Sequence, residues 1–136
     1  MLGGTVLGGT VLGMSADCLF CRIIRQEIPS TEVVSSARSY AFRDLNPMAP
    51  THVLVIPRLH ITNADTVLAE HAEDVTDLLV TAQAVARQEG LVREGVDPAV
   101  EGGYRLVFNV GEISGNSVAH LHLHVLGGRR LGWPPG

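Results

Sequence analysis

A run of strictly alternating side chains near the C-terminus constrains this chain most. Residues 120–125 read His-Leu-His-Leu-His-Val. Successive side chains of a β-strand point to opposite faces, so this run predicts a strand over residues 119–126. Its three imidazoles, His120, His122 and His124, share one face, while the apolar side chains face a core. Packing does not need three histidines on one face, so this face is expected to be functional.

The rest of the chain predicts a mixed fold of short elements around this strand. Hydrophobic spacing predicts helices over residues 17–27, with Asp17 as N-cap, and 70–89. Further strands are predicted over residues 31–35, 39–44, 52–57 and 104–110. The longer helix is expected to bury Val75, Leu78, Leu79, Ala82, Val85 and Ala86. Hairpin-like spacing without βαβ alternation predicts an α+β fold, a five-stranded antiparallel sheet with two helices.

Length and composition favour one domain over residues 17–136 of the 136-residue chain. Residues 1–16 begin with a near-repeat of Leu-Gly-Gly-Thr-Val and are interpreted as a disordered or non-native extension. That stretch lacks the basic start of a signal peptide and is too glycine-rich for a membrane helix. We therefore expect a cytoplasmic protein with no membrane association. The net charge of −4 argues against a nucleic acid polymer as partner, but not against a mononucleotide.

Two chemistries use histidines in this arrangement. The imidazoles bind a catalytic zinc with an open position for water, or one imidazole acts as a nucleophile toward phosphorus. The spacing alone does not choose between them. The loop over residues 111–118 is rich in small residues, and its backbone N–H groups and the Ser117 hydroxyl are suited to phosphate oxygens.

The only two cysteines, Cys18 and Cys21, form a Cys-x-x-Cys pair. A disulfide, a redox pair, half of a zinc site and two reduced buried thiols are all compatible with this spacing. The pair alone does not decide among them.

The segment His-Leu-His-Leu-His-Val-Leu over residues 120–126 resembles the signature of the histidine triad family. The resemblance covers residues 17–136. It includes Cys-Leu-Phe-Cys near the start, Thr-His-Val-Leu-Val-Ile-Pro in the centre and Trp-Pro-Pro-Gly at the end, and it points to the nucleotide-binding, Hint-like branch. It implies a purine nucleoside phosphoramidase-like hydrolase of AMP or GMP conjugates. It also implies a homodimer whose sheet continues across the dyad.

The resemblance also implies roles for individual residues. His122 is the nucleophile, His124 contacts the phosphate and assists proton transfer, and His52 tunes the triad. The implied nucleotide-binding residues also include Asp44, Asn109, Gly115, Ser117 and Trp133, the last reaching toward the partner's site. Two alternatives remain open: a non-catalytic nucleotide-binding or interaction module, and a hydrolase whose triad binds catalytic zinc.

The same resemblance implies a structural zinc ion. Family members with the Cys-x-x-Cys pair resemble this chain in using Cys18, Cys21, His60 and His120 as ligands. Members without the pair still hydrolyse nucleotides, so the metal is not expected to take part in the chemical step.

Overall fold

The computed structural model describes residues 17–136, and the expected extension over residues 1–16 lies outside this part. Five strands form one antiparallel sheet in the order β1-β2-β3-β5-β4. The strands are β1 (Glu32–Ser35), β2 (Ser39–Arg43), β3 (Thr51–Pro57), β4 (Arg105–Phe108) and β5 (Leu123–Gly127). The α-helices are α1 (Leu19–Ile24) and α2 (Ala72–Gln88). The expected α+β fold is confirmed. Within the described residues, no helix has the length and apolar character needed to cross a bilayer.

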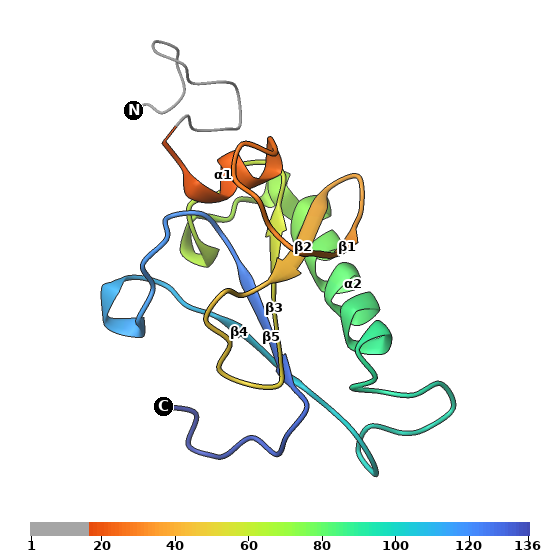
Figure 1. The fold of residues 1–136 in the computed structure, drawn as a ribbon. Coiled ribbons are helices and arrows are strands. Elements are labelled where there is room, and N and C mark those ends of the chain that lie inside the picture. Colours follow the sequence, from red (N-terminus) through yellow and green to blue (C-terminus); the bar gives the residue numbers. More distant parts are fainter. Residues whose placement is uncertain (1–16) are drawn as a thin grey trace.

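The sheet lies between two separate apolar clusters, one on each face. Helix α2 runs along one face and α1 lies at the other (Figure 1). The α2 side contains Val53, Val55, Leu121, Leu123 and Val125 with the buried residues of α2. The α1 side contains Phe20, Ile23, Phe42, Leu54 and Ile56. Alternation along β3 and β5 therefore places the apolar partners of the histidines in the larger core, as expected.

Helix α1 is shorter than predicted, and its N-cap is Cys18, not Asp17. The Cys18 sulfur accepts a hydrogen bond from the Cys21 backbone N–H at 3.3 Å, which satisfies a donor of the first turn. This contact also fixes one cysteine relative to the other.

Helix α2 buries a slightly different stripe from the one predicted. Leu79 is exposed, whereas Asp74 and Thr81 are buried. Asp74 is tolerated there because Arg38, in the turn between β1 and β2, donates to it at 3.1 Å. An ion pair therefore replaces part of the apolar contact at the N-terminal half of the helix.

Strand β5 begins at Leu123, later than predicted, so His120 and His122 precede the regular ladder. Its neighbour β3 ends at Pro57, which has no N–H to donate. Leu121 instead donates its N–H to the Ile61 carbonyl at 2.6 Å. The chain stays close to β3 here, but it is released from regular pairing where the first two histidines lie.

Candidate active site

The three histidines lie on the α1 side of the sheet, where Phe20 of α1 packs against two of them. The Phe20 ring packs edge-on against His120 and His122, with centroids 5.8 and 5.2 Å away. The rings of His122 and His124 also contact each other, with their centroids 5.0 Å apart. The shared face is as expected, but each imidazole has a different hydrogen-bond partner, and these partners decide what each ring can do.

His122 is held by a main-chain carbonyl. Its Nδ1 lies 2.7 Å from the carbonyl oxygen of His120. A carbonyl only accepts, so Nδ1 carries the proton and Nε2 keeps its lone pair in the neutral ring. Burial lowers the pKa of His122 below its ordinary value, although the hydrogen bond to His120 opposes this shift. The ring is therefore neutral near pH 7, with a nitrogen suited to nucleophilic attack.

His124 and His52 form a hydrogen-bonded pair, with His52 Nε2 2.9 Å from His124 Nδ1. Asp44 lies beside them, its carboxylate 3.4 Å from His52 Nε2. Burial, followed by the charges of His122 and His52, lowers the pKa of His124 to about 4. Burial also lowers the pKa of His52, while Asp44 opposes that shift. Both rings are neutral near pH 7.

Asp44, His52 and His124 also place three possible metal-ligand atoms close together. Two nitrogens bound to one tetrahedral zinc ion lie about 3.3 Å apart, given bonds of about 2.0–2.1 Å. The nitrogens of His52 and His124 are 2.9 Å apart, which is a hydrogen-bond distance. His52 and His124 are therefore better described as a hydrogen-bonded pair with Asp44 beside it than as ligands of one metal ion.

A cavity of about 310 Å³ opens in front of His122 and His124. One part of its wall is apolar, with Phe20, Phe42 and Leu54 on it. The polar part brings together most of the residues expected to hold a nucleotide, namely Asp44, Asn109, Gly115, Ser117, His122 and His124. The cavity thus offers an apolar wall for a flat ring and polar groups near the histidines.

Two of the residues expected to act in catalysis or nucleotide binding lie outside this cavity. His52 stands behind His124 and contacts it through the hydrogen bond described above. Trp133 is 81 % exposed and packs near the Arg105 guanidinium of β4, 5.9 Å from its ring centroid. Arg105 also donates to the Gly132 carbonyl at 2.8 Å, which holds the C-terminal segment against β4. Within a single chain, Trp133 does not contribute to the cavity.

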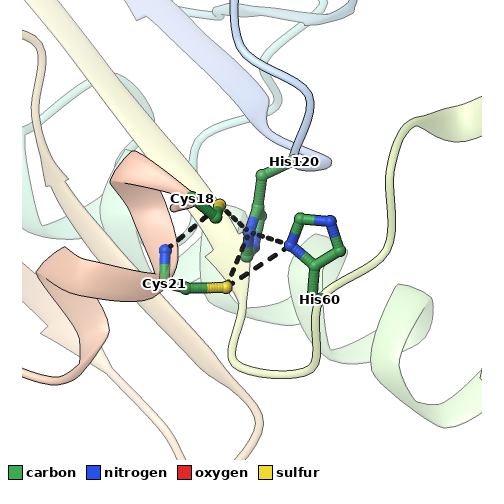
Figure 2. Close-up of side chains that lie close together, drawn as sticks. All are labelled: Cys18, Cys21, His60 and His120. Atoms are coloured by element: carbon green, nitrogen blue, oxygen red, sulfur yellow. Dashed lines mark hydrogen bonds between the residues drawn. The ribbon is translucent and has the colours of Figure 1, made fainter. Parts of the chain in front are cut away.

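The four residues expected to bind zinc converge on one point. Cys18 and Cys21 come from the start of α1, His60 from the segment after β3 and His120 from the segment before β5 (Figure 2). His120 Nδ1 lies 3.2 Å from the Cys18 sulfur, 3.6 Å from the Cys21 sulfur and 3.1 Å from His60 Nδ1. The Cys21 sulfur is 3.4 Å from His60 Nδ1. Two sulfurs and two nitrogens thus face a common centre.

These distances fit a tetrahedral zinc ion. Bonds of about 2.3 Å to sulfur and about 2.0–2.1 Å to nitrogen place sulfur and nitrogen about 3.5 Å apart, and two nitrogens about 3.3 Å apart. His120 Nε2 lies 3.0 Å from the Pro57 carbonyl, so its proton is on Nε2 and Nδ1 is available to a metal. Hydrogen bonds from Cys21, then His120 and His60, hold the pKa of the Cys18 thiol far below its ordinary value. The donor set therefore fits zinc.

The sequence reasoning did not identify several residues that shape the site. The apolar wall of the cavity includes Leu19, Phe20, Ile23, Phe42, Leu45 and Leu54. Alternation along β2 and β3 places Phe42 and Leu54 on the histidine face, so that signal was present. By contrast, the hydrogen bond from the Met48 backbone N–H to His52 Nδ1, at 3.0 Å, has no signature in the sequence.

Comparison with known proteins gives consistent matches over most of the chain. The family model described as "HIT domain" matches residues 25–131. A purine nucleoside phosphoramidase from Escherichia coli is 41 % identical over 119 residues, covering 88 % of this chain and 93 % of that protein. A 14 kDa zinc-binding protein from Zea mays is 45 % identical over 120 residues, covering 87 % of each chain.

Solved structures agree with these matches. The crystal structure of a HIT family hydrolase from Legionella pneumophila is 46 % identical to this chain, with a TM-score of 0.79. The similarity covers 88 % of this chain and all of that one.

Proposed function

This chain belongs to the HIT domain family, and from that premise we propose that it is a nucleotide hydrolase that cleaves nucleoside 5′-phosphoramidates, or related nucleotide conjugates, at the α-phosphorus. The observation that carries the proposal is the orientation of His122. Its Nδ1 proton is engaged by the His120 carbonyl at 2.7 Å, which leaves the Nε2 lone pair for attack. The similarity to a purine nucleoside phosphoramidase supports an AMP or GMP conjugate as substrate.

In the first step, the lone pair of His122 Nε2 forms a bond to the α-phosphorus. The bond from phosphorus to the leaving nitrogen breaks, its electron pair stays on nitrogen, and the amine departs after taking up one proton. The product on the enzyme is a nucleotidyl-histidine. Splitting the displacement into two steps avoids direct attack by water on an anionic phosphorus.

In the second step, water attacks the same phosphorus and the bond to Nε2 breaks. The electron pair returns to His122, the nucleoside monophosphate leaves, and one proton from water is released. The proton taken up in the first step is thus balanced, and the enzyme returns to its starting state.

The surrounding residues hold the substrate for this reaction. Asn109, Gly115 and Ser117 line the cavity where phosphate would lie, and the Ser117 hydroxyl and loop N–H groups are donors for its oxygens. Asp44 lines the same cavity and would accept hydrogen bonds from ribose hydroxyls. His124, behind which His52 stands, is the ring beside the nucleophile and faces the charge that develops on phosphorus.

Zinc has a structural role in this proposal. Cys18, Cys21, His60 and His120 would hold it and join α1 to the catalytic segment. The converging ligand atoms and the similarity to a zinc-binding protein support this assignment. None of these four residues lines the cavity beside His122 and His124, so the metal is not assigned to the chemical step.

We also propose that the protein acts as a cytoplasmic homodimer. Strand β4 is an edge of the sheet, and an antiparallel copy of β4 would satisfy its outward backbone groups. The C-terminal segment, held along β4 by Arg105, would then carry Trp133 toward the partner's cavity.

The direct test is incubation of the purified protein with adenosine 5′-phosphoramidate and detection of AMP. In a second experiment, a single turnover of substrate labelled in its nucleotide is stopped with alkali, and label on the protein is measured. Alkali is used because a phosphohistidine bond is acid-labile. Release of AMP with label on His122 supports the proposal. Binding of AMP without turnover would favour the non-catalytic module, and activity lost in proportion to removed zinc would favour the zinc hydrolase.

A further inference from the structure

The loop between β2 and β3 is held by a turn that lies about eighty residues later in the chain. Arg129, just after β5, donates from Nη2 to the Met48 carbonyl at 3.0 Å. Its neighbour Gly128 has a φ of +91°, and a Cβ there would lie 2.8 Å from the Pro50 Cβ. The close approach of turn and loop therefore depends on glycine at 128, and Arg129 anchors residue Met48 through its carbonyl.

The backbone N–H of Met48 contacts a histidine. The Met48 backbone N–H donates to His52 Nδ1 at 3.0 Å. An amide N–H is only a donor, so Nδ1 has to accept, and the neutral ring carries its proton on Nε2. The Asp44 carboxylate, 3.4 Å from Nε2, also favours a proton there.

The tautomer of His52 sets that of His124. His52 Nε2–H faces His124 Nδ1 at 2.9 Å, so Nδ1 accepts and the proton of neutral His124 lies on Nε2. That Nε2 is buried and has no hydrogen-bond partner among the described residues. His124 lines the same cavity as His122. A buried N–H without a partner beside a nucleophile indicates a donor kept for a ligand.

We propose that Arg129 and the Met48 backbone form a positioning unit that, through His52, holds His124 as the tautomer whose Nε2–H faces the α-phosphate of a bound nucleotide. The identity of the ligand rests on the proposed function, whereas the tautomers rest on the hydrogen bonds alone. A neutral N–H fixed beforehand stabilises negative charge on a phosphoryl oxygen without reorganising during the reaction. Arg129 is a positioning residue because it touches neither substrate nor reacting atoms.

The tautomers are measured by long-range ¹H–¹⁵N NMR on the full chain with ¹⁵N-labelled histidine. We expect Nε2–H for His52 and His124 in the wild type. His71 is an internal reference, because its Nδ1 accepts from the Leu68 N–H at 2.9 Å and it does not line the cavity. In Arg129→Ala, the signals of His52 and His124 should shift toward a tautomer mixture while those of His71 stay unchanged. Nδ1–H on His124 in the wild type would overturn the proposal without any variant.

Kinetics with adenosine 5′-phosphoramidate provide the second readout. In Arg129→Ala we expect kcat to fall about 10-fold to 100-fold, the scale found for partners that orient working imidazoles, with KM changed less than threefold. Arg129→Lys keeps a donor within reach of the Met48 carbonyl and should recover most of kcat. Arg130→Ala is the matched control, since only the backbone carbonyl of Arg130 contacts Arg129, and its kcat should match the wild type.

Two results separate the proposals. A lower melting temperature in Arg129→Ala, with unchanged tautomers and unchanged kcat of the folded protein, would assign Arg129 a purely structural role and overturn the inference. Tautomers that are as expected in the wild type and shift in Arg129→Ala, in a protein that hydrolyses no nucleotide conjugate, would support the positioning unit and reject the proposed function.

Discussion

The three histidines of the shared face differ in the group that their Nδ1 atom contacts. His120 Nδ1 faces the cysteines, His122 Nδ1 faces a carbonyl and His124 Nδ1 faces another imidazole. The three rings therefore do not converge on one metal ion, although the sequence alone left that arrangement open. Among the three, His122 combines an oriented proton with a lone pair beside the cavity.

Replacing His122 with alanine should abolish turnover and leave nucleotide binding nearly intact. The nucleophile is lost, while the phosphate donors of the loop and the apolar wall remain. We expect the single-turnover rate to fall by about 10⁴-fold or more, with the Kd for AMP changed only slightly. Rapid mixing and calorimetry measure the two quantities. His71→Ala is the matched control and should be fully active, and substantial single-turnover chemistry in His122→Ala would reject the assignment.

The lowered pKa of His124 makes stability depend on pH. In the unfolded chain this ring takes up a proton near its ordinary pKa of about 6.5, but in the folded protein only near about 4. Between these values the unfolded state binds more protons, so the free energy of unfolding decreases as the pH falls from about 6.5 to about 4. This slope is proportional to the number of protons taken up on unfolding, and His124→Gln should reduce that number by up to about one. Denaturant unfolding at several pH values tests this, and parallel curves for the two proteins would contradict it.

At the scale of elements, α1 is a six-residue helix that depends on contacts outside itself. Short isolated helices are marginal in water, so tertiary contacts must hold it. Phe20 and Ile23 bury its apolar face, and the two cysteines place its first turn against His60 and His120. A metal ion at this point would tie α1 to the segment that carries the proposed nucleophile, His122.

We therefore expect purified protein to contain one zinc ion per chain. Chelation should lower the melting temperature on the order of 10 °C, because binding of a structural metal contributes to folding. The rate of the protein that remains folded should change much less. Metal analysis, thermal unfolding and activity are measured on the same samples. In the double variant Cys18→Ser and Cys21→Ser, chelation should have no further effect, and zinc-free wild-type protein of full stability would rule the site out.

Sequence patterns predicted the elements well where side-chain periodicity is strong. Alternation over residues 120–125 predicted the histidine face and the opposing core, and turn residues predicted the hairpin between β1 and β2. The errors arose where a contact distant in sequence decides. Pro57 ends β3, so regular pairing begins only at Leu123 and β5 is shorter than predicted. Arg38, from a distant turn, allows Asp74 to be buried in α2. The partner of each imidazole, and hence its tautomer, depends on loops whose geometry has no periodic signal.

At the scale of the whole molecule, β4 leaves one edge of the sheet unpaired within residues 17–136. Leu106 on this strand and Val110 just after it are 38 % and 42 % exposed, so the edge is also partly apolar. An exposed edge of this kind favours pairing with another strand. A second copy of this chain would pair with it by two-fold symmetry and extend the sheet.

Light scattering after gel filtration should therefore give a mass of about twice the 14.5 kDa of one chain at micromolar concentration. Leu106→Pro removes a backbone donor from the β4 edge and should shift the protein toward monomer. Ser35→Pro makes the corresponding change on β1, at the opposite edge, and should leave the dimer intact. A monomeric wild type, or equal effects of the two substitutions, would contradict an interface at β4.

The hydrogen bond from His122 to the His120 carbonyl has a consequence for how such a chain can evolve. A partner supplied by a side chain is lost through a single codon change, but every amino acid at position 120 supplies a carbonyl. The proposed zinc site and the proposed nucleophile can therefore be lost independently: a substitution at position 120 would remove one proposed zinc ligand, yet the acceptor that orients His122 would still be encoded. A related chain could therefore discard the proposed metal site and still hold His122 in the same orientation.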